Sequence, residues 1–134
     1  MSTNEVLEIN TTDKDFFLEY LVLKKPVLEM ILSIVNKKKI NLNPKLLHVF
    51  ALLLYYNYVY SEYEDDVKWK MVFDHSTKQQ IMNEVKINDS HLNTYISMMR
   101  NMHLLTGKEI SKPFIFYPEE GYELTFKFIF NNEK

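Results

Sequence analysis

Apolar residues in the first third of the chain are spaced as in short helices. A weak alternation over residues 5–9 predicts a short strand, and the threonines and aspartate at 11–13 are candidate N-caps for a helix over 16–23. Pro26 suits the first turn of a further helix over 27–35, because an N–H is not needed there. The lysines that follow at 37–39 suit a helix C-terminus.

A longer helix is predicted over residues 45–60, after the start signal Asn43-Pro44. Its apolar side chains cover more than one face, so the helix is either central to the fold or partly buried against another subunit. The acidic stretch 62–66 reads as a solvated loop. From 67 to 73 the apolar period changes to two, which predicts a short strand.

Residues 80–105, QIMNEVKINDSHLNTYISMMRNMHLL, contain the pattern of two helices joined by a short break. Asp74 or Ser76 is expected to cap the first helix, and Ser76 with Gln79 has the spacing of a capping box. The second helix is predicted over 90–105. Its neutral polar face raises the question of what it recognises.

Alternation returns after Glu109 and predicts a terminal β-hairpin. One strand begins at 109 and continues to 117, and the second covers 122–130, where aromatic and aliphatic residues alternate with polar ones. The turn between them is Pro118-Glu119-Glu120-Gly121. This hairpin is the strongest strand pattern in the chain.

The order from residue 45 onward is helix, strand, helix, turn, helix and β-hairpin. This order resembles the winged helix-turn-helix family over about two thirds of the chain. The two crossing helices of that family bury apolar residues where they touch, and this chain has apolar residues at the same spacing. They are Ile81, Val85, Ile87, Leu92 and Tyr95 or Ile96. Met82 and Lys86 depart from the family, which often has a small residue and a glycine there; Lys86 must adopt an unfavourable backbone or a different turn.

The resemblance implies an α+β fold that is mainly helical. It comprises a winged helix-turn-helix domain over 44–134, with a C-terminal β-hairpin wing, and an N-terminal helical extension over 1–43 that is a candidate for dimerisation. The helix over 90–105 corresponds to the recognition helix of the family. It is the element expected to enter a DNA major groove.

The recognition helix has one polar and one apolar side at about 100° per residue. The polar side carries Ser90, Asn93, Thr94, Ser97 and Asn101, flanked by His91 and Arg100. Amides and hydroxyls of this kind pair with base edges, and Asn93 suits adenine while Arg100 suits guanine or a phosphate. An ordinary solvated face has the same composition. The apolar side is expected to be core and carries Leu92, Tyr95, Ile96, Met99, Met102 and His103.

Positive charge for DNA phosphates has to come from a few residues, because the formal net charge is -2. The expected phosphate contacts are Lys78, Lys86, Arg100, Lys108 and Lys112. The predicted wing tip, Glu119 and Glu120, repels phosphate and is not expected to touch DNA. Whether the cations share one side decides between DNA and another partner.

Several classes of protein and site are disfavoured by the sequence. The chain has no cysteine, no glycine-rich phosphate loop and no metal-ligand spacing among its histidines, so we expect no enzyme, cofactor or metal site. His48 reads as a core or interface histidine. Its apolar run, 46–60, is too short to cross a membrane, and the N-terminus lacks a secretion signal, which predicts a cytoplasmic protein.

Two functions remain after these exclusions. The first is a non-enzymatic double-stranded DNA-binding protein, a transcription regulator or a replication initiator such as phages and plasmids encode. It is expected to act as a homodimer through the apolar helices over 27–35 and 46–60. The alternative is a winged-helix module that binds a protein partner in assembly, which the acidic stretch 62–66 and the acidic wing tip favour.

Overall fold

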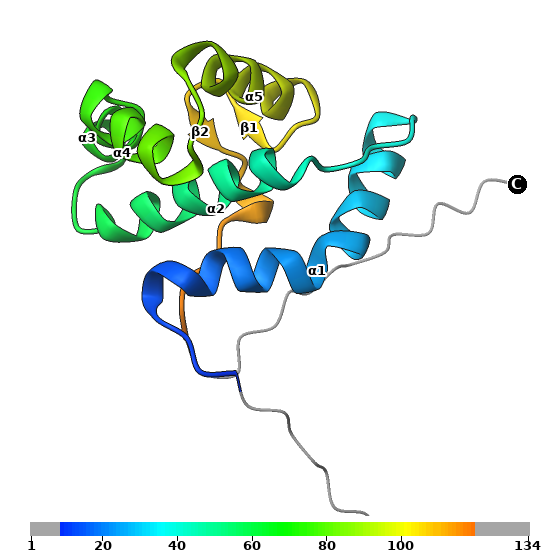
Figure 1. Ribbon diagram of the computed structural model, residues 1–134, viewed down its shortest axis with the longest axis horizontal. Helices are drawn as coiled ribbons and strands as arrows, with labels where there is room; N and C mark the ends of the chain where they lie inside the picture. The colour runs from blue at the N-terminus through cyan, green and yellow to red at the C-terminus, as the bar shows by residue number, and fades with distance from the viewer. Residues whose placement is uncertain (1–8, 120–134) are drawn as a thin grey trace, which may run out of the picture.

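The computed structural model describes residues 9–119, which form five α-helices and a small antiparallel hairpin (Figure 1). The elements are α1 (Asp13–Asn36), α2 (Pro44–Val59), α3 (Asp65–Val72), α4 (His75–Val85), α5 (Asp89–Asn101), β1 (Leu105–Thr106), β2 (Glu109–Ile110) and the 3-10 turn η1 (Lys112–Phe114). This mainly helical content with a hairpin is compatible with the expected α+β class. The predicted strand at 5–9, except for residue 9, and the predicted strand at 122–130 lie outside the described residues.

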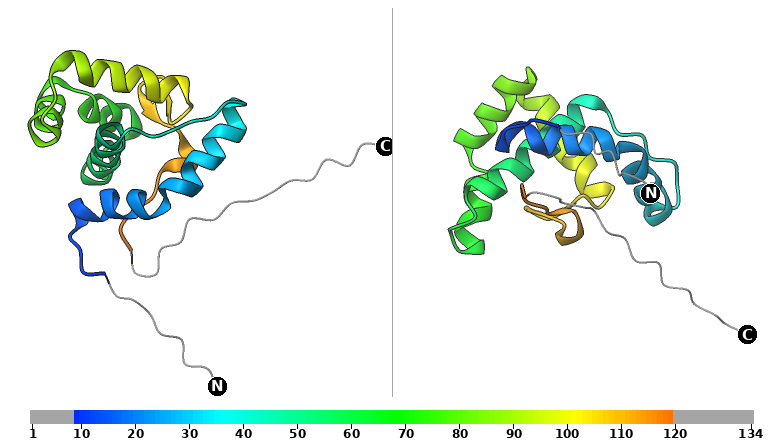
Figure 2. Two further views of the ribbon diagram at one scale, coloured as in Figure 1. Left: turned by 45° about the vertical axis from the view of Figure 1, so that its right-hand side comes forward. Right: turned by 90° about the horizontal axis from the view of Figure 1, so that it is seen from below.

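Helix α2 is the centre of the fold, which is the first of the two alternatives that its all-round apolar pattern left open. It begins after Asn43, whose Oδ1 accepts a hydrogen bond from the Lys45 N–H (2.8 Å). Figures 1 and 2 show α1 on one side of α2 and the α4 and α5 pair on the other. Apolar side chains are therefore buried around most of its circumference, and α2 offers little surface for the dimer contact expected of 46–60.

Helix α1 corrects the prediction of two helices separated at Pro26. Thr12 caps it by accepting from the Asp15 N–H (3.2 Å), and the helix continues without a break through Pro26 to Asn36. A proline inside a helix removes one hydrogen bond and bends the axis, and Figure 1 shows such a bend in α1. Pro26 is exposed, so water can reach the carbonyl that it leaves unpaired, and burial of Leu28 and Leu32 holds the second half in place.

Helix α3 replaces the strand predicted over 67–73, and that prediction was wrong. Trp69 and Val72 are buried three residues apart, whereas Val67, on the supposed inner face of the strand, is 46% exposed. Asp65 and Asp66, assigned to a loop, form the first turn, where acidic side chains favour a helix N-terminus. A seven-residue alternation is too short to exclude a helix with one buried side.

Helices α4 and α5 confirm the predicted pair of helices and the burial of most of the apolar residues expected between them. Asp74, rather than Ser76, is the N-cap of α4, and its Oδ1 accepts from the Thr77 N–H (2.8 Å). The turn after α4 uses Lys86 in the left-handed region (φ 64), so the chain accepts the unfavourable backbone that the missing glycine implied. Of these apolar residues, Ile81, Val85, Leu92 and Ile96 are buried, while Ile87 and Tyr95 are half-buried.

The end of α5 and the hairpin differ from the prediction. The helix stops at Asn101 rather than 105, because His103 adopts φ 72 and the chain turns into β1; His103 is exposed, not core. β1 pairs with β2 in the register Leu105↔Ile110. The two-residue loop begins with Gly107 at φ 62, as in the type II′ turns of tight hairpins.

The segment after β2 is not the strand predicted to reach 117. Residues 112–114 form η1, with Pro113 unable to donate to a strand ladder. Phe116 is buried instead against the Phe17 and Tyr20 rings of α1, with centroid distances of 5.4 and 5.0 Å. The burial of Phe116 against α1 therefore outweighs the preference for a strand that the alternation of apolar and polar residues indicated.

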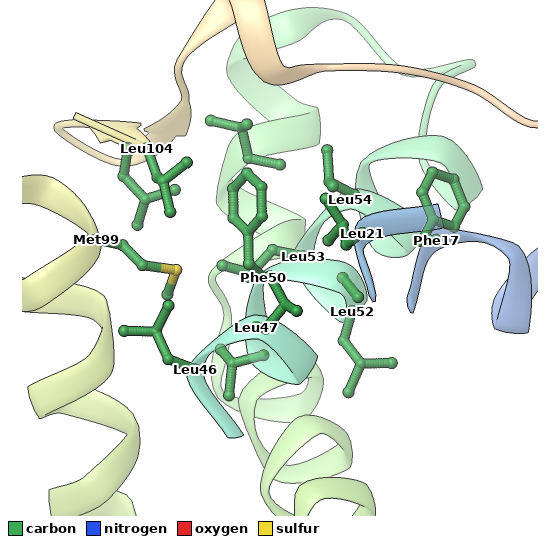
Figure 3. Packing of buried hydrophobic residues seen from close by; sticks show 14 of the residues in the cluster. Phe17, Leu21, Leu46, Leu47, Phe50, Leu52, Leu53, Leu54, Met99 and Leu104 are labelled. Carbon is green, nitrogen blue, oxygen red and sulfur yellow. The ribbon is translucent and has the colours of Figure 1, made fainter. Parts of the chain in front are cut away.

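One apolar core joins all five helices and the hairpin. Figure 3 shows Phe50 of α2 between Met99 and Leu104 on one side and Leu21 and Phe17 of α1 on the other. Met99 and Met102 are buried, as expected of the apolar side of α5. No helix in the described part of the chain has both the length and the apolar character needed to cross a bilayer.

Candidate nucleic-acid interface

The polar side of α5 is exposed along its whole length. Asn88 caps the helix by accepting from the His91 N–H (2.8 Å), and burial of the opposite side against α2 and β1 fixes its rotation. The exposed side chains are those predicted, namely Ser90, His91, Asn93, Thr94, Ser97, Arg100 and Asn101. The Thr94 hydroxyl donates to the Ser90 carbonyl (2.9 Å) and keeps its lone pairs for a partner.

A hollow of about 350 Å³ lies against one flank of this polar side, and we call it the cationic hollow. It is lined by Phe73, Lys78, Asn93, Ile96, Ser97, Arg100 and Lys108. None of these lining residues is acidic, so three positive side chains face a shared space without a carboxylate among them. The hollow thus combines positive charge with the Asn93 amide, the Ser97 hydroxyl and the apolar side chains of Phe73 and Ile96.

Three separate elements place the cations of the cationic hollow. Lys78 is in the first turns of α4, Arg100 is near the end of α5, and Lys108 is in the β1–β2 loop. The Arg100 Nε donates to the Gly107 carbonyl (2.7 Å), which ties α5 to that loop. This bond orients the guanidinium and leaves its terminal nitrogens free for an anion.

Two of the predicted phosphate contacts are not gathered into this site. Lys86 forms the turn between α4 and α5, and Lys112 begins η1. Both are exposed, but neither lines the cationic hollow. Three of the five expected cations therefore share one surface beside α5.

A second hollow, of about 340 Å³, was not anticipated. It is lined by Lys38, Lys39, Ile40, Asn41, Met98, Asn101 and Met102, so it joins the α1–α2 loop to the C-terminal end of α5. We call it the loop hollow. The only signal in the sequence was the run of lysines at 37–39, which had been explained by the end of a helix. Nothing local indicated that this run lies beside α5.

The histidines show no arrangement that would hold a metal. Among residues 9–119 there is no group of three or more His, Asp or Glu side chains close enough for one ion. His48 Nε2 is 3.6 Å from Glu84 Oε2, and Glu84 also pairs with Lys14. The hydrogen bond with Glu84 raises the pKa of Lys14 above its usual value.

No protein-family model, curated protein or solved structure matches this chain. The geometry and charge around α5 therefore carry the functional proposal.

Proposed function

We propose that the protein binds duplex DNA without catalysis, as a winged helix-turn-helix regulator or replication initiator with α5 as its recognition helix. The observation that carries this proposal is the cationic hollow. It brings Lys78, Arg100 and Lys108 together beside Asn93 and Ser97. Cations that bind a phosphate backbone are needed next to groups that read base edges, and this surface supplies both.

The hairpin β1–β2 supports the same assignment through the lysine in its loop, while Glu120 and the rest of the predicted acidic wing beyond it lie outside the described residues. In this proposal the wing is β1–β2, and its loop presents Lys108 where the sequence pattern had placed Glu119 and Glu120. A short basic loop beside a recognition helix suits a phosphate contact.

A protein-binding module is the second candidate and is less well supported. The acidic residues that favoured it, Asp65 and Asp66 among them, are exposed in the first turn of α3 and do not line the cationic hollow. The exposed polar side of α5 carries one acidic residue, Asp89 in its first turn, and one large apolar residue at its edge, Met98 (40% exposed). Polar, cationic surfaces of this kind suit nucleic acid better than a protein core contact.

We further propose a homodimer in which α1 meets its copy. One side of α1 leaves Val22, Leu23, Met30, Ile34 and Val35 more than half exposed. Three cations beside one α5 make a modest footprint, and a second copy would double it across two half-sites. Exposed apolar residues that recur along one helix suit a contact between two equal surfaces.

Disrupting this side of α1 is expected to dissociate the dimer. Met30→Glu with Ile34→Glu introduces charges at the centre of the apolar side, and sedimentation velocity should then show a monomer at concentrations where the wild type is dimeric. The control is Ser61→Glu with Asn83→Glu, which introduces the same charge at exposed positions outside α1 and outside both hollows. A wild type that is monomeric at high concentration would contradict the dimer and leave DNA binding by one copy to be measured separately.

Base reading by α5 is tested with a duplex sequence selected from a random AT-rich pool. Asn93→Ala is expected to weaken binding to the selected sequence by about 1 to 3 kcal/mol, or roughly 5- to 150-fold, since a bidentate contact to adenine is lost. Binding to random duplex DNA should change less than about twofold, because phosphate contacts remain. Fluorescence anisotropy over a salt series measures both.

The matched control for this experiment is Asn83→Ala, an exposed asparagine on α4 outside the cationic hollow. It should leave both affinities unchanged. Absence of wild-type binding to any duplex at low salt would refute the proposed function. If Asn93→Ala lowers the affinity for selected and random DNA equally, Asn93 does not read a base.

A further inference from the structure

The cationic hollow and the loop hollow lie on opposite flanks of α5. The cationic hollow is lined from α5 by Asn93, Ile96, Ser97 and Arg100, and the loop hollow by Met98, Asn101 and Met102. At about 100° per residue, these two sets project to opposite sides of the helix. The exposed polar side runs between them, so α5 forms a ridge with a positively lined depression on each flank.

The loop hollow takes its charge from Lys38 and Lys39, which are exposed. Both come from the α1–α2 loop, outside the segment that resembled a winged helix. The residues lining this hollow include no carboxylate. Met98 and Met102 supply an apolar wall, which suits a deoxyribose placed beside a phosphate.

Specific hydrogen bonds hold the α1–α2 loop against the end of α5. The Asn36 Nδ2 donates to the Met102 carbonyl (3.1 Å), and the same nitrogen lies 2.8 Å from the Leu32 carbonyl. Lys37 adopts the left-handed conformation (φ 54) at the end of α1, and this sends the next two lysines toward α5. The position of the lysines relative to α5 is thus set by a bond between the two helix ends.

Side chains of α1 also fix the rest of the loop. The Ser33 hydroxyl accepts from the Ile40 N–H (2.8 Å), and the Glu29 carboxylate accepts from the Leu42 N–H (2.6 Å). Ile40 and Leu42 are themselves buried. A loop held at both ends and by two buried side chains leaves little backbone entropy to lose on binding, so the cost of ordering falls mainly on the lysine side chains.

Duplex DNA has a matching arrangement of charge. The major groove is about 12 Å wide and an α-helix with side chains is about 10 to 12 Å across, so a helix in the groove has one phosphate backbone on each flank. The cationic hollow supplies charge for one backbone only. A second set of cations is required on the other flank, which is where Lys38 and Lys39 lie.

We propose that Lys38 and Lys39 bind the phosphates of the second DNA strand, so that α5 is held in the major groove between two cation sets. This inference rests on the proposed function and deepens it. It makes the α1–α2 loop part of the DNA interface and fixes which flank of α5 faces which strand.

The first experiment removes the two charges in the full chain. Lys38→Gln with Lys39→Gln is expected to reduce the slope of log affinity against log salt by about 2 and to weaken binding to random duplex DNA by about 10- to 100-fold at 0.1 M salt. The charge-matched control is Lys24→Gln with Lys25→Gln, on the middle of α1, which should stay within about twofold. Circular dichroism checks that each variant is folded.

The second experiment assigns the strands by phosphate-ethylation interference on a selected duplex. Lys38→Gln with Lys39→Gln should lose contacts on one strand of the recognised groove, and Lys78→Gln with Lys108→Gln should lose contacts on the other. Loss of the same phosphates by both variants would overturn the inference. So would an effect of the Lys38 and Lys39 changes no larger than that of the control.

The two proposals fail in different ways. If the wild type binds no duplex, or binds single-stranded RNA or an acidic peptide more tightly, the proposed function and this inference are both refuted. If the wild type binds duplex DNA and only the loop lysines prove neutral, the inference alone is refuted. If each variant loses phosphate contacts on a different strand, the result supports both the proposed function and this inference.

Discussion

Replacing Lys78, Arg100 and Lys108 together with glutamine is expected to weaken binding to random duplex DNA by about 10²- to 10³-fold at 0.1 M salt, since each phosphate contact contributes about 0.9 to the salt slope. These are the cations that line the cationic hollow. The slope itself should fall by nearly 3. Anisotropy titrations at several salt concentrations measure both quantities, and the slope distinguishes lost phosphate contacts from a general loss of affinity.

Arg100 has to be separated from the two lysines, because its Nε also bonds the Gly107 carbonyl. Lys78→Gln with Lys108→Gln keeps that bond and should lose about two thirds of the triple variant's change in slope. Arg100→Lys keeps a charge but loses the oriented guanidinium, and it should weaken binding with little change in slope.

The control for the triple variant changes three lysines elsewhere, Lys24, Lys25 and Lys70, to glutamine. It makes the same change in net charge, and its sites line neither hollow. If the two triple variants lose the same affinity, the effect belongs to overall charge and the cationic hollow is not the site. A tenfold or larger difference between them would localise the phosphate contacts.

Truncating Phe50 to alanine is expected to lower the free energy of unfolding by about 3 to 5 kcal/mol, because a large ring is lost and a cavity is left behind. Phe50 is 0% exposed, and Figure 3 places it at the centre of the core. It contacts the layers on both sides of α2, so little can move to fill the space. Urea denaturation followed by circular dichroism measures the change.

Val59→Ala is the control on the same helix, because Val59 is 43% exposed and its truncation should cost less than about 0.5 kcal/mol. Typical domains have about 5 to 15 kcal/mol of stability, so Phe50→Ala can leave the protein partly unfolded. Phe50→Leu, expected to cost about 1 to 2 kcal/mol, keeps the measurement quantitative. A loss below 1 kcal/mol for Phe50→Ala would contradict the central role of α2.

Helix boundaries were predictable wherever capping residues and long apolar patterns agreed. Asn43 before α2 and Asp74 before α4, both expected from the sequence, each accept a backbone N–H near the helix start. These signals act within three or four residues, so they survive without knowledge of the fold. The exposed and buried sides of α5 followed from the same local geometry.

The errors occurred where tertiary burial competes with a weak local pattern. Pro26 bends α1 but does not end it, because the second half of α1 is buried on the core. The alternation at 67–73 fits a strand, but burial of Trp69 and Val72 selects a helix. Phe116 enters an aromatic cluster with α1 instead of extending a strand. A short pattern compatible with two structures is decided by what packs against it.

The sequence by itself determined α2, α4, the start and polar side of α5 and the set of available cations, because caps and periodicity are local properties of the chain. Only the tertiary structure decided which cations stand beside α5. Lys78 and Lys108 come to one flank through the packing of α4 and the hairpin. Lys38 and Lys39 come to the other through the bond from Asn36 to Met102, which are 66 residues apart. Contacts between distant segments depend on how the helices pack, and no local pattern of charge contains that information.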